Sequence, residues 1–102
     1  GPVTGGDIHY SVRHARAVLR FFRELMDEAP DAFQATLNLT PGERGVFVSL
    51  CHAGSENEAE RLLRSLRAIA PPTREFVKRQ EFGALAERPA ATNPTNTTPN
   101  RL

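Results

Sequence analysis

Two segments of the chain place apolar residues on one face of a helix. The first follows Ser11 and ends before Pro30, and its apolar positions recur every three or four residues, as on an amphipathic helix. The second opens with Ser55 and Glu58, an S-x-x-E capping box that satisfies free first-turn amides, and Pro71–Pro72 ends it. The two apolar stripes are Ala15, Val18, Leu19, Phe22, Leu25 and Met26, and Ala59, Leu62, Leu63, Leu66 and Ile69.

Alternation of apolar and polar residues predicts strands around these helices. Residues 33–39 alternate strictly, and residues 46–51 run back as a hairpin partner after the turn at Thr40–Gly42. Shorter strands are expected at 7–10 and 75–78. The order β-α-β-β-α-β predicts an α+β, ferredoxin-like fold, in which an antiparallel sheet carries both helices on one face.

The period of two along a strand assigns each strand residue to one face of the sheet. The side chains expected to point at the helices are Ile8, Tyr10, Phe33, Ala35, Leu37, Leu39, Val46, Val48 and Leu50. The opposite face, called the open face below, is expected to carry Asp7, His9, Gln34, Thr36, Asn38, Phe47, Ser49 and Cys51. Hydroxyls and amides are common in a solvated sheet. The central Phe47 and the scarcity of Lys and Glu on these strands favour an interface instead.

The length of 102 residues predicts one domain. We place this domain at residues 5–88 and expect a short helix at 82–87. Residues 1–4 are interpreted as a tag scar and leader, because Gly1–Pro2 is typical of a cleaved tag. Residues 89–102 are rich in Asn, Thr and Pro, a composition typical of an extended or disordered tail.

Charge and cysteine content narrow the classes of partner and compartment. The formal net charge is +1, so neither nucleic acid nor an anionic membrane is an expected partner. No apolar run is long enough to span a membrane, and no signal peptide is visible. Cys51 is the single cysteine, which excludes an internal disulfide framework. We expect a cytoplasmic protein.

Candidate chemistry is concentrated on the open face. Cys51 and His52 are neighbours on a strand, so they point to opposite faces and cannot form a nucleophilic pair. His9 shares the face of Cys51, is expected one step away diagonally, and is a weak candidate for acid–base catalysis. The three histidines lack metal-ligand spacing, so no metal site is predicted. The residues predicted to bind a substrate are Thr36, Asn38, Phe47, Ser49 and Cys51.

A series of short motifs extends over most of the chain. They are Gly5–Gly6 leading a strand that ends in Tyr10, the helix 15–26 closed by Ala29–Pro30, Cys51–Gly54, a helix containing residues 58–63, and the segments 66–72 and 82–85. In order and spacing they resemble the substrate-side subdomain of the berberine-bridge-like FAD-linked oxidoreductases of the vanillyl-alcohol-oxidase superfamily. The chain has Phe82 and Ala86 where that family usually has Tyr and Gln.

The resemblance implies a lid over a substrate pocket, with the open face turned towards a flavin. FAD is implied only for the full-length family, because the glycine-rich flavin region and its covalent His and Cys attachment points have no counterpart here. We therefore expect a stand-alone or excised substrate-recognition domain that holds no cofactor and is not redox-active alone. Its open face is expected to meet a separate flavin domain, a second copy or a small-molecule ligand.

Two other functions remain open at this point. One is a small dimeric cyclase or isomerase with its pocket on the open face, in which His9 would be the acid–base group and Thr36, Asn38 and Ser49 would bind polar substrate groups. The other is a non-catalytic binding or assembly protein that uses the same face.

Overall fold

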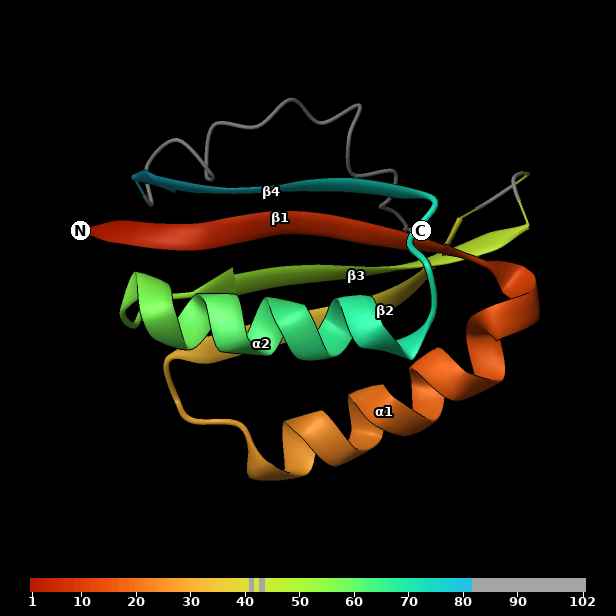
Figure 1. Cartoon of the computed structure of the whole chain (residues 1–102), viewed down its shortest axis with the longest axis horizontal. Coiled ribbons are helices and arrows are strands. Elements are labelled where there is room, and N and C mark those ends of the chain that lie inside the picture. The colour runs from red at the N-terminus through yellow and green to blue at the C-terminus, as the bar shows by residue number, and fades with distance from the viewer. Residues whose placement is uncertain (41, 43, 82–102) are drawn as a thin grey trace, which may run out of the picture.

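The computed structural model describes residues 1–40, 42 and 44–81. Within them the predicted order of elements is confirmed (Figure 1). The elements are β1 (Pro2–Ser11), a 3-10 turn η1 (Val12–His14), α1 (Ala15–Glu28), β2 (Phe33–Thr40), β3 (Gly45–His52), α2 (Glu56–Ile69) and β4 (Arg74–Glu81). The helix predicted at 82–87 and the tail at 89–102 lie outside the described residues.

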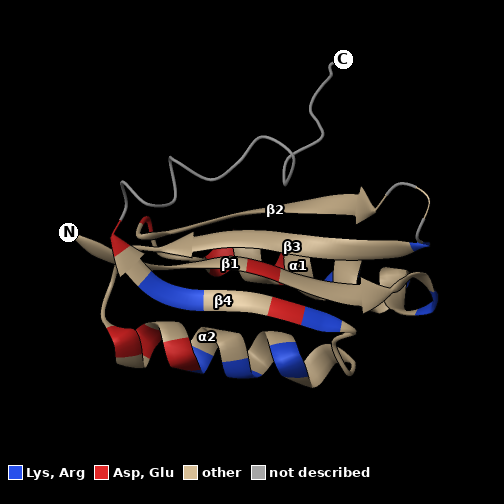
Figure 2. Ribbon diagram, turned by 90° about the horizontal axis from the view of Figure 1, so that it is seen from above, with Lys and Arg blue, Asp and Glu red and all other residues tan. Residues whose placement is uncertain are grey.

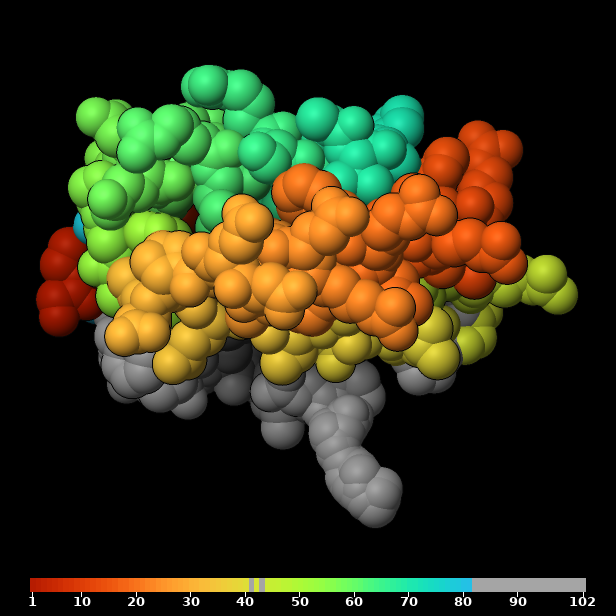
Figure 3. Space-filling model, turned by 90° about the horizontal axis from the view of Figure 1, so that it is seen from below, coloured from red at the N-terminus to blue at the C-terminus, as the bar shows by residue number. Residues whose placement is uncertain are grey.

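The strands form one sheet in the order β2-β3-β1-β4, and every neighbouring pair is antiparallel. Both helices lie on the same side of this sheet (Figure 1). Seen from that side, α1 crosses the molecule with α2 next to it (Figure 3). The expected α+β fold with both helices on one face of an antiparallel sheet is therefore confirmed.

The central strand is longer than its sequence pattern predicted. β1 was expected at residues 7–10, but it begins at Pro2, whose partner on β4 is Glu81. Residues 2–4, which the sequence interpretation set outside the domain, thus belong to the sheet, and Val3 is buried. The hydrogen-bonding partners on both sides explain the extension, because β3 reaches His52 opposite Thr4 and β4 reaches Glu81 opposite Pro2.

At Gly6 the backbone of β1 lies close against that of β4. Its φ of 145° is in a region that L side chains rarely adopt. A Cβ atom there would lie 1.6 Å from the carbonyl oxygen of Phe76. The pairing of Gly6 with Val77 therefore depends on the missing side chain.

Side-chain caps are present at the beginning of η1 and of α2. The predicted capping box is present: the amide of Ser55 donates to Glu58 Oε1 at 3.1 Å, and the amide of Glu58 donates to Ser55 Oγ at 3.2 Å. Ser11 Oγ accepts from the amide of Arg13 at 3.3 Å and so caps η1. α1 ends at Glu28, as expected from Pro30.

The core lies between the helices and the sheet, where Ile8, Tyr10, Val18, Val48 and Leu66 are the largest fully buried side chains. Two residues assigned to this layer from the sequence are instead at the surface: Leu19 is 40% exposed and Leu39 is 74% exposed. Leu19 lies at one border of the α1 stripe, and Phe21, at the other border, packs against the core. Leu39 is the penultimate residue of β2.

Two polar contacts attach the C-terminal end of α2 to the sheet. The Tyr10 hydroxyl donates to the Leu66 carbonyl at 2.6 Å, and this carbonyl belongs to the last turn of α2. Arg67 donates to both carboxylate oxygens of Glu75 on β4, with Nε at 2.9 Å from Oε1. Hydrogen bonds from Arg67 hold the pKa of Glu75 below its usual range.

Candidate functional site

The strand register brings all the predicted site residues together on the open face. On this face, residues that lie opposite one another on neighbouring strands form three rows across the sheet, from β2 to β4. They are Asn38–Phe47–His9–Arg74, Thr36–Ser49–Asp7–Phe76 and Gln34–Cys51–Gly5–Lys78. His9 and the five predicted substrate-binding residues thus share one face, as the period of two predicted.

Three rings from three adjacent strands form an aromatic cluster at the centre of this face. His9 on β1 stacks on Phe47 of β3, with ring centroids 4.8 Å apart and 19° between the planes. Phe76 on β4 meets His9 edge-on at 6.0 Å and 88°. Arg74 extends over Phe76, with its guanidinium carbon 5.7 Å from the ring centroid. The three rings are not coplanar, and together they form a polarisable apolar surface against which another ring can pack.

Amides and hydroxyls lie beside the cluster on β2 and β3. The side-chain amide of Asn38 donates to Thr36 Oγ1 at 3.0 Å, so the two side chains hold one another in place. Ser49 lies between Thr36 and Asp7 in the middle row. β2 and β3 carry no Lys, Arg, Asp or Glu along their lengths, whereas β4 does (Figure 2). The open face therefore has an uncharged half and a charged half, with the aromatic cluster at their border.

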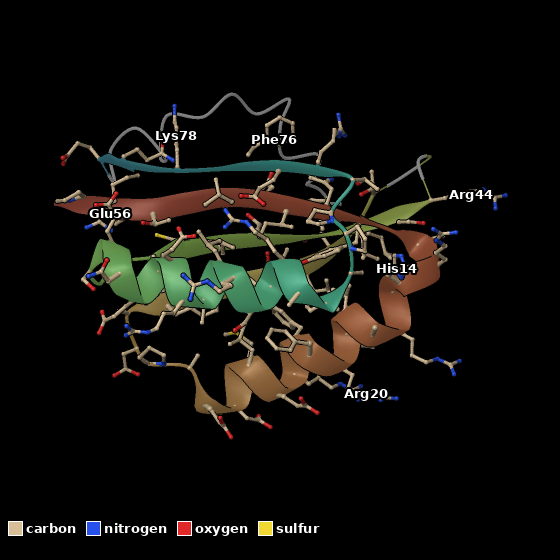
Figure 4. The ribbon with its side chains drawn as sticks, in the orientation of Figure 1. His14, Arg20, Arg44, Glu56, Phe76 and Lys78 are labelled. Atoms are coloured by element: carbon tan, nitrogen blue, oxygen red, sulfur yellow. The ribbon has the colours of Figure 1, made fainter. Side chains whose placement is uncertain are left out.

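Sequence reasoning missed Phe76 and Arg74. Figure 4 shows Phe76 and Lys78 on the side of β4 that points away from the helices. The alternation along β4 predicts that Arg74, Phe76 and Lys78 share one face, and the aromatic ring of Phe76 could have drawn attention to that face. Whether it is the open face or the helix side depends on the pairing of Gly6 with Val77, which no local sequence pattern shows.

The cysteine and histidine positions give one confirmation and one correction. His52 is buried on the helix side, where its Nδ1 accepts from the Gly54 amide at 2.9 Å, so it points away from the face of Cys51, as predicted. His9 pairs with Phe47, and Cys51 pairs with Gly5. The expected diagonal proximity of His9 and Cys51 is therefore wrong, because Ser49 lies between Phe47 and Cys51 on that face.

The electrostatics of Cys51 favour a neutral thiol. Burial raises the pKa of this thiol above its usual value, which lowers the fraction of the nucleophilic thiolate at neutral pH. Within residues 1–40, 42 and 44–81, no three His, Cys, Asp or Glu side chains are grouped so that they could hold a metal ion. What the described part of this face presents is a ring surface bordered by hydrogen-bonding groups.

Across the described residues, neither helix is long and apolar enough to cross a membrane. Comparison with known proteins adds no relative: no protein-family model matches the chain, and no curated protein matches it.

Proposed function

We propose that this chain is the substrate-recognition domain of an FAD-linked oxidoreductase and is not redox-active alone. The observation that supports this proposal most strongly is the aromatic cluster of His9, Phe47 and Phe76 on the face opposite both helices. In flavoenzymes the flavin performs the electron transfer, and the protein binds and orients the substrate. A domain that contributes recognition needs a binding surface with directional polar groups, and the open face has both.

In this proposal the two faces of the sheet have different roles. Both helices pack on one face, so that face supplies stability, while the other is left for contact with substrate and flavin domain. A planar substrate ring would stack on the aromatic cluster. Its hydroxyl groups would bind Asn38, Thr36 and Ser49, which lie one or two strands away. In this proposal His9 is a stacking surface beside the substrate, whereas the cyclase or isomerase alternative needs it as an acid–base group.

Vanillyl alcohol, an uncharged phenolic ring, is a suitable probe of this surface. We expect a weak, saturable interaction that shifts the backbone amide signals of His9, Phe47 and Phe76 in two-dimensional NMR spectra and leaves those of α1 unchanged. Phe47→Ala should abolish the shifts, because it removes the ring that stacks on His9. Leu19→Ala, a change at an exposed position on α1, is the control. Shifts distributed over α1 and α2, or shifts that survive Phe47→Ala, would contradict the proposal.

The same preparation tests the expectation about the cofactor. The purified chain should be colourless and should not retain FAD during gel filtration, because the sequence has no glycine-rich phosphate-binding turn followed by a helix. Co-elution of about one equivalent of flavin absorbance would show that this domain binds the cofactor itself.

A further inference from the structure

The two edges of the sheet differ in their protection against further strand pairing. β2 and β4 are the outer strands, and among the described residues each has one neighbour. The N–H and C=O groups on the free side of an edge strand are a template for another strand, so natural edges are usually blocked by charged side chains, proline or a bulge. β4 has such protection, because five of its eight residues are charged (Figure 2).

β2 has none of these protecting features. Phe33–Thr40 contains no charged residue and no proline, and in Figure 2 it is the outermost strand on its side of the sheet. Its pairing with β3 runs without interruption from Phe33 opposite His52 to Thr40 opposite Gly45, so the strand has no bulge. The free side of β2 is therefore a regular, uncharged line of backbone donors and acceptors.

The side chains of β2 show which kind of segment fits beside it. On the helix side, Leu39 is the most exposed large apolar side chain of the described residues, at 74%, and Ala35 and Leu37 are partly buried against the core. On the open face, Gln34 and Thr36 are exposed. Side chains that lie opposite one another on neighbouring strands interact. A strand that alternates apolar and polar residues would thus cover Leu39 and place its polar residues along the open face.

We propose that β2 is a docking edge that binds an extended, uncharged segment of a partner protein as an additional strand of the sheet. In this mode of recognition main-chain hydrogen bonds supply affinity, and side chains at alternate positions supply specificity. The partner segment has apolar residues at every second position, to match β2. The partner is a different chain, since two copies that meet through their open faces leave this edge free in both. Docking uses only groups of β2, so it does not depend on the proposed function.

The test uses a short, terminally capped peptide of alternating Thr and Val residues and measures amide hydrogen exchange of the full chain by two-dimensional NMR. In β2 the amides that point away from β3 should exchange fast in the free chain, and saturating peptide should slow them about tenfold or more. The amides of β4, the other edge, should not change. A peptide in which Pro replaces each Val lacks half of the donors and cannot extend the ladder, so it should give no protection.

Leu39→Lys places a charge beside the apolar side of the added strand and should weaken peptide binding about tenfold. Leu19→Lys is the matched control, because it puts the same charge at an exposed leucine of α1. Thermal melting checks that both variants are folded. Equal affinities of the two variants, protection of β4, or no protection of β2 would overturn the proposal. Dimers of Phe47→Lys that Leu39→Lys dissociates would also overturn it, because the occupant of the edge would then be a second copy.

Discussion

Tyr10 connects the middle of the sheet to the end of a helix through a single side chain. Its ring belongs to the core and is 1% exposed. Its hydroxyl donates to the Leu66 carbonyl, which lies in the last turn of α2. Burial raises the pKa of Tyr10 to about 12, and the nearby Glu75 charge adds to this effect. Only the neutral Tyr10 hydroxyl can donate this hydrogen bond to Leu66, so the bond is lost when Tyr10 is deprotonated.

Alkaline pH should therefore weaken the fold through this residue. The unfolded chain loses the tyrosine proton near pH 10, whereas the folded chain keeps it until about pH 12. The folded state thus binds more protons in this window, so stability is fully present below pH 10 and falls as pH rises through the folded pKa. Tyr10 is the sole tyrosine, so near-ultraviolet titration of tyrosinate absorbance reports on it alone. A midpoint near pH 10 in the folded protein would contradict the buried hydrogen bond.

Gly6 should tolerate no side chain. In Gly6→Ala the new methyl group would meet the Phe76 carbonyl oxygen at 1.6 Å, at a φ of 145°. We expect a loss of about 3 kcal/mol or more in unfolding free energy, measured by urea denaturation, because β1 and β4 must separate locally. Gly1→Ala is the control, since a Cβ there meets nothing within 4 Å. Equal stability of the two variants would mean that β1 and β4 pair differently.

At the scale of elements, α1 and α2 cover the sheet to different extents. α2 buries Ala59, Leu63 and Leu66, whereas Val18 is the one fully buried residue of α1. Five further apolar side chains of α1 are partly buried against the core, namely Ala15, Phe21, Phe22, Leu25 and Met26, and Leu19 is exposed. We infer that α2 is the main stabilising helix and that α1 is a looser cover.

Matched leucine truncations test this difference. Leu63→Ala removes a side chain that is 5% exposed and should cost about 2–5 kcal/mol of unfolding free energy. Leu19→Ala truncates a side chain that is 40% exposed and should cost less than about 1 kcal/mol. Urea denaturation of both variants and the wild type measures the two costs. Similar costs would place Leu19 in the core, where the sequence pattern alone had put it.

The elements could be predicted from the sequence because each has a local signal. The helices have apolar stripes, the Ser55 capping box and prolines after their ends, and β2 and β3 alternate strictly. The first half of β1 has no such signal, since Gly5 and Gly6 resemble a loop by composition. Its strand character depends on partners more than forty residues away. Long-range pairing also placed Phe76 beside His9, so the aromatic cluster could be predicted only in part.

At the scale of the whole molecule, the two sides of the sheet are unequal. One side holds both helices and the core, and the other presents the aromatic cluster with its polar and charged neighbours. Phe76 on the edge strand β4 is 56% exposed, so the aromatic cluster leaves a large apolar ring open to contact. A net charge of +1 gives little repulsion between copies. For the isolated chain we therefore expect two open faces to meet around a two-fold axis.

Self-association should accordingly depend on Phe47. We expect the wild type to associate at high concentration and Phe47→Lys to remain monomeric, because pairing would bury the new charge. Leu19→Lys, which adds the same charge on the helix side, should associate like the wild type. Light scattering or sedimentation velocity gives the masses. A wild type that is monomeric at every concentration would show that the open face does not pair with itself.

The pairing of Pro2 with Glu81 has a consequence for how this fold can be built into a larger protein. These residues are opposite each other on neighbouring antiparallel strands, where Cα atoms are only about 5 Å apart. A chain that leads into the fold at Pro2 and out of it at Glu81 therefore enters and leaves at the same end of the sheet. The whole sheet with its two helices can thus be inserted into one surface loop of a host domain, or circularly permuted with a short linker, without breaking any strand.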